Sequence, residues 1–169
     1  MTTALPAGHA GIAAPGLFLA TRYFLVAGAA DARRPLNAFD GALLAAGLAD
    51  VNLVRLSSIV PPGCVRIPPV RHQPGCLVPV AYASLTHTAA GERIASAVAV
   101  ARPTDPLRPA VVMEYSAVGA SRAQTETVAA EMAADALAAR DLTVDDIDVI
   151  GAEHTVAVAG ATFAGVVEL

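Results

Sequence analysis

The sequence predicts an α+β fold in which antiparallel sheets are stacked in layers. Seven segments carry the β-branched and aromatic residues or the alternation of strands, whereas two segments have the apolar spacing of a helix. The connections between strands are mostly short, as expected for antiparallel neighbours. A length of 169 residues fits one domain, so we treat residues 1–169 as a single domain.

The first strand is expected over Phe18–Ala27, where aromatic and β-branched residues gather, and a small, charged turn is expected over Gly28–Arg34. A helix follows and runs to about Ala46, and Gly47 ends it. Asn37 with Asp40 three residues later resembles a capping box at the start of this helix. The helix presents one apolar face, formed by Phe39, Leu43 and Ala46.

The next strand covers Val51–Leu56 and leads to a serine pair, Ser57 and Ser58. The prolines at positions 61 and 62 cannot donate backbone hydrogen bonds to a neighbouring strand, so the extended run must end near Val60. The serine pair therefore lies where a regular element gives way to a rigid loop. Active-site residues are common at such junctions, because the scaffold fixes them while the loop leaves them accessible.

Beyond a proline-rich stretch that ends at Pro74, the chain alternates between strands and one further helix. This helix spans Ser121–Arg140, with apolar residues recurring at helical spacing: Val128, Met132, Ala136 and Ala139. Gly91 and the segment Pro103–Pro106 mark turns between strands. The remaining strands are expected over Cys76–Thr88, Glu92–Arg102, Ala110–Val118, Asp145–Val158 and Ala161–Glu168.

The composition and charge exclude several classes of protein. The net charge is −4 and there is no basic run, so no nucleic-acid partner is expected. The uncharged stretch Thr2–Thr21 lacks a basic start and is broken by prolines and glycines, so we expect a loose N-terminus, no signal peptide and no membrane span. Two cysteines, Cys64 and Cys76, fit no disulfide framework, which favours a reducing, cytoplasmic setting.

Two further features of the composition bear on assembly and chemistry. Hydrophobic residues make up 55% of the chain and the mean hydropathy is +0.56, which indicates apolar surface to be buried by oligomerisation. All eleven basic residues are arginine. Because pyridoxal-phosphate enzymes hold their cofactor on a lysine, this chain alone cannot bind it that way.

The four histidines show neither HxxxH nor HExxH spacing, so no metal site is expected.

The stretch from Asn52 to Pro62 closely resembles the processing site of the pyruvoyl-dependent arginine decarboxylases. Three more blocks resemble the same family in the same order, namely Pro35–Leu44, Val112–Tyr115 and Glu153–Val156. The resemblance runs from near Leu25 to the C-terminus. It implies a four-layer αββα sandwich with antiparallel or mixed sheets, assembled as a homotrimer.

The resemblance also implies that the chain cuts itself between Ser57 and Ser58, giving residues 1–57 and residues 58–169. The hydroxyl of Ser58 would attack the carbonyl of Ser57 and convert the amide to an ester. Elimination would leave dehydroalanine, and hydrolysis would release ammonia and leave a pyruvoyl group at the start of the larger fragment. Without the resemblance, a Ser-Ser turn that merely caps backbone groups would explain the same residues.

A pyruvoyl cofactor made from Ser58 would replace pyridoxal phosphate. Its ketone would form a Schiff base with the α-amine of a small-molecule amino-acid substrate and accept the electron pair released with carbon dioxide. The resemblance implies L-arginine as substrate and agmatine as product, a reaction that polyamine biosynthesis uses. Two alternatives stay open: a pyruvoyl decarboxylase of another amino acid, and an unprocessed relative with a structural or regulatory role.

The resemblance assigns roles to four residues besides the cofactor serine. Glu114 would donate the proton that replaces carbon dioxide, because burial in an apolar stretch favours its protonated form; an exposed strand face is the alternative. Asp40 would bind the guanidinium of arginine, or would simply cap its helix. Asn52 would support self-cleavage, or would bond a neighbouring loop. Ser57 would contribute to substrate binding.

Overall fold

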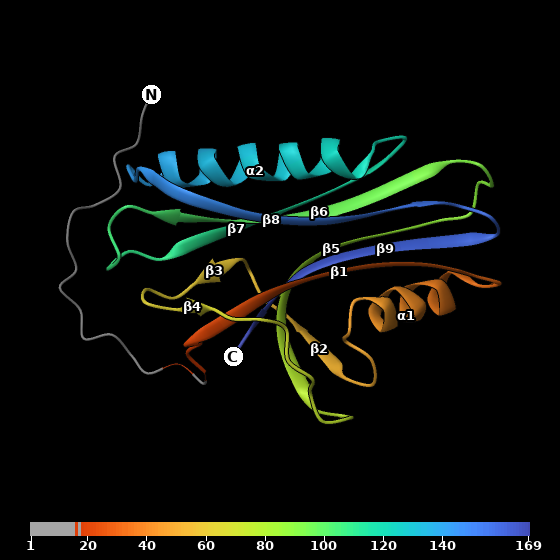
Figure 1. Ribbon diagram of the computed structural model, residues 1–169, viewed down its shortest axis with the longest axis horizontal. Coiled ribbons are helices and arrows are strands. Elements are labelled where there is room, and N and C mark those ends of the chain that lie inside the picture. Colours follow the sequence, from red (N-terminus) through yellow and green to blue (C-terminus); the bar gives the residue numbers. More distant parts are fainter. Residues whose placement is uncertain (1–15, 17) are drawn as a thin grey trace.

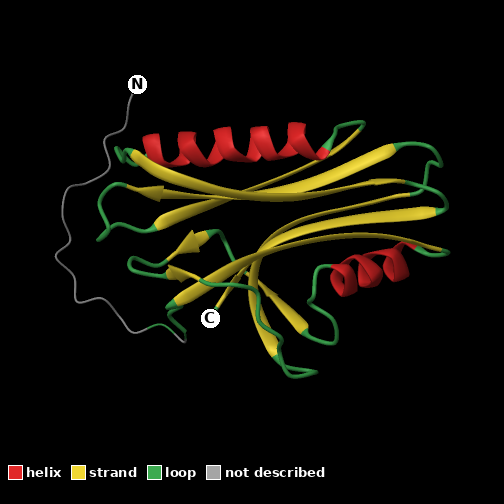
Figure 2. Cartoon of the chain, in the orientation of Figure 1, coloured by secondary structure: helices red, strands yellow, loops and turns green. Residues whose placement is uncertain are grey.

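The computed structural model describes residue 16 and residues 18–169, and it folds them into two β-sheets and two α-helices (Figure 2). The expected loose N-terminus over Thr2–Thr21 falls largely outside the described residues. The elements follow in the order β1 (Arg22–Ala32), α1 (Pro35–Ala45), β2 (Asn52–Arg55), β3 (Ile59–Val60), β4 (Val65–Arg66), β5 (Leu77–His87), β6 (Arg93–Pro103), β7 (Ala110–Val118), α2 (Arg122–Ala138), β8 (Val144–Thr155) and β9 (Ala159–Glu168).

The two sheets differ in strand direction, and both lie between the helices (Figure 1). The five-stranded sheet has the order β2-β5-β9-β1-β4 and is mixed, because β2 runs parallel to β5 and β4 runs parallel to β1. The four-stranded sheet has the order β3-β7-β6-β8 and is antiparallel throughout. The α+β class predicted from the sequence is confirmed.

Three apolar cores hold the elements together. Between the sheets, Leu25 and Val166 of the five-stranded sheet pack with Val98 and Val112 of the four-stranded sheet. Helix α1 covers the other face of the five-stranded sheet, and α2 covers the other face of the four-stranded sheet (Figure 1). The contact with α1 is close, because a Cβ atom at Gly28 would clash with the backbone of α1.

The first strand extends further than predicted. The turn expected over Gly28–Arg34 is wrong for its first five residues, because β1 continues to Ala32 in unbroken register with β9, up to the pair Ala32 and Ala159. Glycine and alanine are weak strand formers, but the pairing with β9 and the cover of α1 outweigh that local preference. Ten consecutive residue pairs thereby join β1 to β9, the last strand of the chain.

Helix α1 begins earlier than the capping box predicted. Pro35 occupies the first turn, Arg34 precedes the helix without a side-chain cap, and Asp40 lies in the second turn. The fixed φ of proline suits the first helical position, which explains the earlier start. The capping role considered for Asp40 is therefore wrong. The most buried residues are small, Ala38 and Ala42, while the predicted Phe39 and Leu43 pack at the edge of this core.

Helix α2 is confirmed, but its buried face is not the predicted one. Ser121 caps the helix, and its side chain and that of Gln124 bond each other's backbone N–H in a capping box. The buried residues are Thr125, Ala129, Ala133, Ala136 and Leu137, whereas Met132 is 37% exposed. Small side chains allow the helix to approach the sheet closely, so the face of α2 that contacts the sheet consists mostly of alanine rather than of the largest apolar residues.

The last two strands are correct in type and shifted at their junction. The structure ends β8 at Thr155 and starts β9 at Ala159. The turn between them is fixed by Asp31, whose carboxylate accepts hydrogen bonds from the backbone of Ala157, Val158 and Ala159. The extended run expected to end near Val60 is divided between the two sheets, because β2 ends at Arg55 and β3 joins the four-stranded sheet. Strand β4, which the sequence did not indicate, lies in the proline-rich stretch and joins the five-stranded sheet. Within the described residues, neither helix is long and apolar enough to cross a membrane.

Candidate active site

The serine pair lies where the chain leaves one sheet and enters the other. Strand β2 pairs with β5 in the five-stranded sheet, and β3, only three residues later, pairs with β7 in the four-stranded sheet. Ser58 makes this passage with φ = 74°, in the left-handed region that non-glycine residues rarely adopt. Strained backbone of this kind costs about 1–3 kcal/mol and is held only where the surrounding structure requires it.

Ser58 contacts Glu114 directly. The hydroxyl of Ser58 donates to the carboxylate of Glu114, at 3.0 Å from Oε2 and 3.3 Å from Oε1. The Ser58 carbonyl accepts a hydrogen bond from the backbone N–H of Val112 at 2.9 Å. Strand β7 therefore fixes both the side chain and the carbonyl of Ser58. The side chain of Glu114 is 23% exposed, between the buried and the exposed positions expected from the sequence.

Arg55 is a third member of the site, and the sequence analysis missed it. Its Nη2 lies 3.7 Å from Oε1 of Glu114 and donates to the carbonyl of Tyr82 at 3.2 Å. Its guanidinium also lies over the Tyr82 ring, 4.6 Å from the ring centroid. The signal that could have found it is a charged residue within a short apolar strand, two positions before the serine pair.

The structure does not bring Asn52 to Ser58. Its side-chain amide donates to the carbonyl of Gly75 at 2.9 Å, at the far end of β2. This contact matches the alternative in which Asn52 bonds a neighbouring loop. Five residues of mostly extended chain separate Asn52 from Ser58.

Asp40 is also remote from Ser58 within one chain, because it lies on α1, which packs on β1, β5 and β9, whereas Ser58 precedes β3 on the other side of the molecule (Figure 1). It is exposed on α1, and among the described residues it makes no hydrogen bond or ion pair. Leu36 and Leu44, about one helical turn before and after Asp40, are 77% and 55% exposed. Helix α1 thus presents a stripe of Leu36, Asp40 and Leu44 away from its own sheet. Ser57 is exposed beside Ser58.

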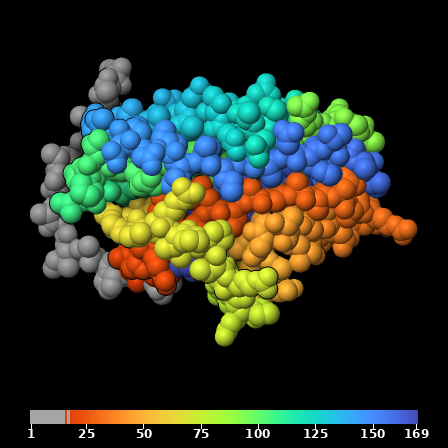
Figure 3. All heavy atoms as spheres, in the orientation of Figure 1, coloured from red at the N-terminus to blue at the C-terminus, as the bar shows by residue number. Residues whose placement is uncertain are grey.

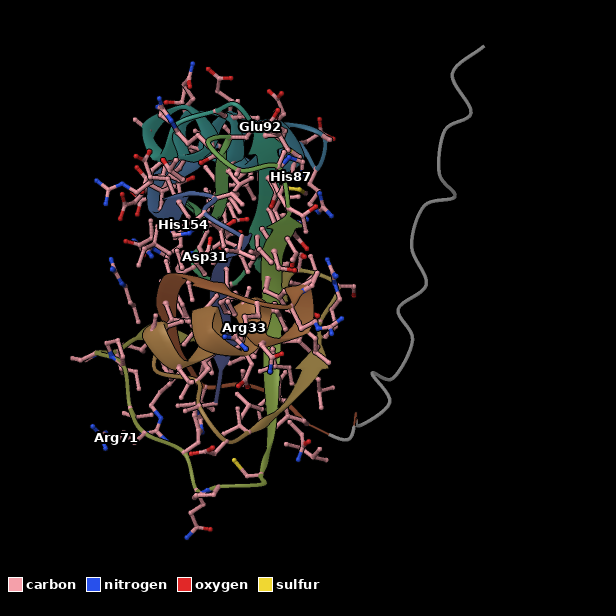
Figure 4. All side chains as sticks on the ribbon, turned by 90° about the vertical axis from the view of Figure 1, so that its right-hand side faces the viewer. Asp31, Arg33, Arg71, His87, Glu92 and His154 are labelled. Atoms are coloured by element: carbon pink, nitrogen blue, oxygen red, sulfur yellow. The ribbon has the colours of Figure 1, made fainter. Side chains whose placement is uncertain are left out.

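A second group of ionisable side chains lies at the end of the molecule away from β3 and β4, and Figure 4 looks onto that end. His154 bonds Asp31 at 3.0 Å, and His87 bonds Glu92 at 2.6 Å. Backbone N–H groups of the β8–β9 turn, first that of Ala157, lower the pKa of Asp31 to about 2. The described residues contain no cluster of three or more side chains suited to a metal ion.

Comparison with known proteins identifies the family. The sequence profile of the pyruvoyl-dependent arginine decarboxylases matches residues 22–167. A pyruvoyl-dependent arginine decarboxylase of Methanococcus vannielii is 43% identical over 140 residues, which cover 83% of this chain and 85% of the relative. The chain belongs to this family. The decarboxylase of that name from Methanocaldococcus jannaschii is 42% identical over 83% of this chain and 84% of its own length. The one from Methanothermobacter thermautotrophicus is 33% identical over 86% and 94%.

The region matched by the pyruvoyl-dependent arginine decarboxylase family includes every candidate residue. It contains the directly connected set of Arg55, Ser58 and Glu114, and also the remote Asp40 and Asn52. Within one chain the structure therefore separates the predicted site into a centre at Ser58 and two outlying positions.

Proposed function

We propose that this chain is a self-processing pyruvoyl-dependent decarboxylase that converts L-arginine to agmatine and carbon dioxide. The observation that carries the proposal is the contact between Ser58 and Glu114 at 3.0 Å, in a chain that belongs to the pyruvoyl-dependent arginine decarboxylases. A nucleophilic hydroxyl, a carboxylate that accepts its proton and a left-handed backbone all coincide at one peptide bond.

Self-processing begins at the peptide bond between Ser57 and Ser58. Glu114 takes the proton of the Ser58 hydroxyl, and Oγ attacks the carbonyl carbon of Ser57. The C–N bond breaks, the Ser58 nitrogen receives the proton, and an ester joins the two residues. Elimination then frees the carboxylate of Ser57, and hydrolysis of the resulting dehydroalanine releases ammonia. The products are residues 1–57 and residues 58–169.

Residues on both sides of the cut would keep the two fragments together. Strand β1 of the first fragment pairs with β9 of the second along ten residues. Between the sheets, Tyr23 of the first fragment donates to Asp148 of the second at 3.2 Å, and Asp148 also binds Arg66 and Arg102. Processing therefore leaves one domain made of two chains.

The residues around Ser58 fit a pyruvoyl group at that position. The carbonyl of residue 58 keeps the hydrogen bond from Val112, and the loss of the hydroxyl frees Glu114. When formed, a pyruvoyl group supplies the electron-withdrawing ketone that decarboxylation of an amino acid needs. Glu114 then holds a proton at Oε2 and delivers it to the substrate carbon that loses carbon dioxide. Ser57, exposed at the same place, contacts the substrate.

The substrate site would be completed in a homotrimer. Asp40 clamps the guanidinium of arginine with two parallel hydrogen bonds, and within one chain it is remote from Ser58. The exposed stripe of Leu36, Asp40 and Leu44 on α1 suits contact with a neighbouring copy, whose Ser58 it would face. Asn52 supports cleavage from the same interface. The two sheets and their covering helices then form a four-layer αββα sandwich in each protomer.

The proposal includes a cytoplasmic enzyme that supplies polyamine biosynthesis with agmatine. Both cysteines, Cys64 and Cys76, are free thiols, which fits a reducing compartment. Burial raises the pKa of the Cys64 thiol, close to the cleavage loop, to about 11, so this thiol stays protonated and inert.

The test compares substrates on purified protein. Release of carbon dioxide is measured with arginine, ornithine, lysine, histidine and aspartate at equal concentration. Agmatine formed from arginine, with at least roughly a hundredfold preference over ornithine and lysine, supports the proposal. Turnover of a substrate without a guanidinium, with arginine inert, would indicate a decarboxylase of another amino acid. A chain that stays uncut and inactive would indicate the structural or regulatory relative.

A further inference from the structure

Arg55 brings a fixed positive charge to the proposed cleavage site. The ion pair with Glu114, the hydrogen bond to the Tyr82 carbonyl and the stacking on the Tyr82 ring all hold the same guanidinium. The side chain is nevertheless 60% exposed. Three separate contacts on an exposed arginine restrict its motion, so its charge has a defined place.

The guanidinium of Arg55 reaches along the sheet toward the serine pair, because it lies over Tyr82, two residues past Val80 on the parallel strand β5. Strand β2 runs parallel to β5 with Arg55 opposite Val80, and the N–H of Leu56 still bonds the carbonyl of Val80. Glu114 connects this guanidinium to the serine pair: its Oε1 lies 3.7 Å from Nη2 of Arg55, and its Oε2 accepts the hydroxyl of Ser58 at 3.0 Å. The guanidinium is therefore one side chain away from the hydroxyl that receives the acyl group of Ser57 during processing.

We propose that Arg55 stabilises the carboxylate that leaves from Ser57 in the elimination step of self-processing. The inference rests on the proposed function and adds a residue and a role to it. In the elimination, the bond between Cβ and Oγ of Ser58 breaks and its electron pair leaves with the carboxylate of Ser57. The Cα proton of residue 58 passes to water. A full negative charge thus develops on Ser57, where a nearby cation lowers the barrier.

The contact between Arg55 and Glu114 describes the state before the cut. The guanidinium is then the counter-ion of Glu114, whose carboxylate also accepts the hydrogen bond of the Ser58 hydroxyl. After elimination, the carboxylate of Ser57 competes for the same guanidinium. Arg55 would therefore change partners, from the carboxylate of Glu114 to that of Ser57.

The chain contains a matched ion pair for comparison. Arg122 and Glu126 on α2 are also 3.7 Å apart, and their side chains are 61% and 25% exposed, against 60% and 23% for Arg55 and Glu114. The pair on α2 has the helical spacing of four residues and lies outside the cleavage site. Arg122→Met therefore removes the same charge with the same exposure and serves as the control.

The experiment follows self-processing of freshly translated protein by intact mass, with and without hydroxylamine, which cleaves esters. In Arg55→Met, the acyl shift still occurs but elimination slows roughly ten- to hundredfold. The ester then accumulates, and hydroxylamine releases a fragment whose N-terminal Ser58 can be read by Edman degradation. Arg55→Lys restores part of the rate because it retains the charge. Arg122→Met processes at the wild-type rate.

Arg55→Gln keeps an N–H for the Tyr82 carbonyl without the charge, and it should accumulate the ester as Arg55→Met does. Normal elimination in both variants, or slow processing with no trapped ester, would overturn the role of Arg55 as the cation for the leaving group. A wild-type chain that stays uncut would instead refute the proposed function itself, and this inference with it. The thermal midpoint of folded Arg55→Met should match that of Arg122→Met, because both side chains are exposed.

Discussion

Two residues of this chain share a left-handed backbone and differ in everything around it. Asp141, with φ = 56°, follows α2, where the N–H groups of Asp141 and Leu142 bond carbonyls of the last helical turn. A left-handed residue at a helix end is common and satisfies the open carbonyls there. Ser58, with φ = 74°, lies between two strands that belong to different sheets.

The difference separates the ordinary turn at Asp141 from the geometry at Ser58 on which the proposed chemistry depends. Asp141 is exposed and its conformation ends a helix. Ser58 is held by β7 through its carbonyl and its hydroxyl, and the hydroxyl meets a carboxylate. Left-handed backbone alone is therefore no sign of a functional site, and the proposal for Ser58 depends on its combination with a hydroxyl bonded to a carboxylate.

The largest expected effect on cleavage comes from Ser58→Ala, with Asp141→Ala as its control. Both substitutions place alanine at a positive φ. Asp141→Ala costs on the order of 1 kcal/mol of stability because aspartate tolerates this backbone better than alanine, whereas wild-type Ser58 already carries the strain. Ser58→Ala also removes the attacking hydroxyl, and it should abolish cleavage and decarboxylation. Asp141→Ala should cleave completely. Intact mass and carbon dioxide release measure both outcomes; a Ser58→Ala protein that still yields two fragments would contradict the account.

The next effect compares two glutamates that each pair with an arginine. Glu114→Gln should lower kcat by roughly 10²–10⁴, because an amide cannot deliver the proton to the substrate carbon. Glu126→Gln should leave kcat unchanged, since Glu126 pairs with Arg122 on α2. Steady-state assays on the processed fraction of each protein separate turnover from cleavage. Equal kcat in the two variants would remove Glu114 from its role.

A smaller effect is expected at Asp40. Asp40→Asn should raise KM for arginine roughly tenfold to a hundredfold, because the charged partner of the guanidinium is lost. Asp50→Asn is the control, since asparagine tolerates the left-handed backbone that Asp50 adopts at φ = 61°. Thermal unfolding should be alike in both proteins, because Asp40 does not cap α1. A lowered melting temperature with unchanged KM would contradict the assignment.

The smallest effect concerns stability rather than activity. Burial raises the pKa of Glu168, at the end of β9, from 4.5 to about 7. The folded state then holds its proton while the unfolded state loses it, so the free energy of unfolding falls as pH rises from 4.5 to 7, by roughly 3 kcal/mol at most. Glu168→Gln should remove this fall and stabilise the protein at pH 8. Urea titrations at pH 4.5 and pH 8 measure it; an unchanged pH dependence would contradict it.

The sequence predicted element types well and interior contacts poorly. The strand over Ala110–Val118 was predicted to the residue, because a long apolar run bounded by turns leaves little choice. The face of α2 was misjudged, because the sheet accepts Ala129 and Ala133 at close approach and leaves Met132 outside. Hydrophobicity ranks side chains by size, whereas packing against a flat sheet selects small ones.

For the candidate site, too, the sequence predicted residues better than the contacts between them. Ser58 and Glu114 are 56 residues apart, and their pairing follows from the resemblance to a family rather than from local pattern. The proposed role of Arg55 depends on its contacts with Glu114 and Tyr82, which no periodicity in the sequence indicates. In the proposed trimer, Asp40 of one copy would face Ser58 of another, a relation that no spacing within one chain predicts. Such long-range relations follow from tertiary pairing, which local spacing does not determine.

The most direct test of the central claim is the intact mass of protein purified immediately after synthesis and again after incubation. The account predicts that the 17.0 kDa species is replaced by two fragments, residues 1–57 and residues 58–169. The larger fragment should resist Edman degradation and should gain a label from borohydride reduction at its first residue. A single unlabelled 17.0 kDa species after long incubation would contradict the account.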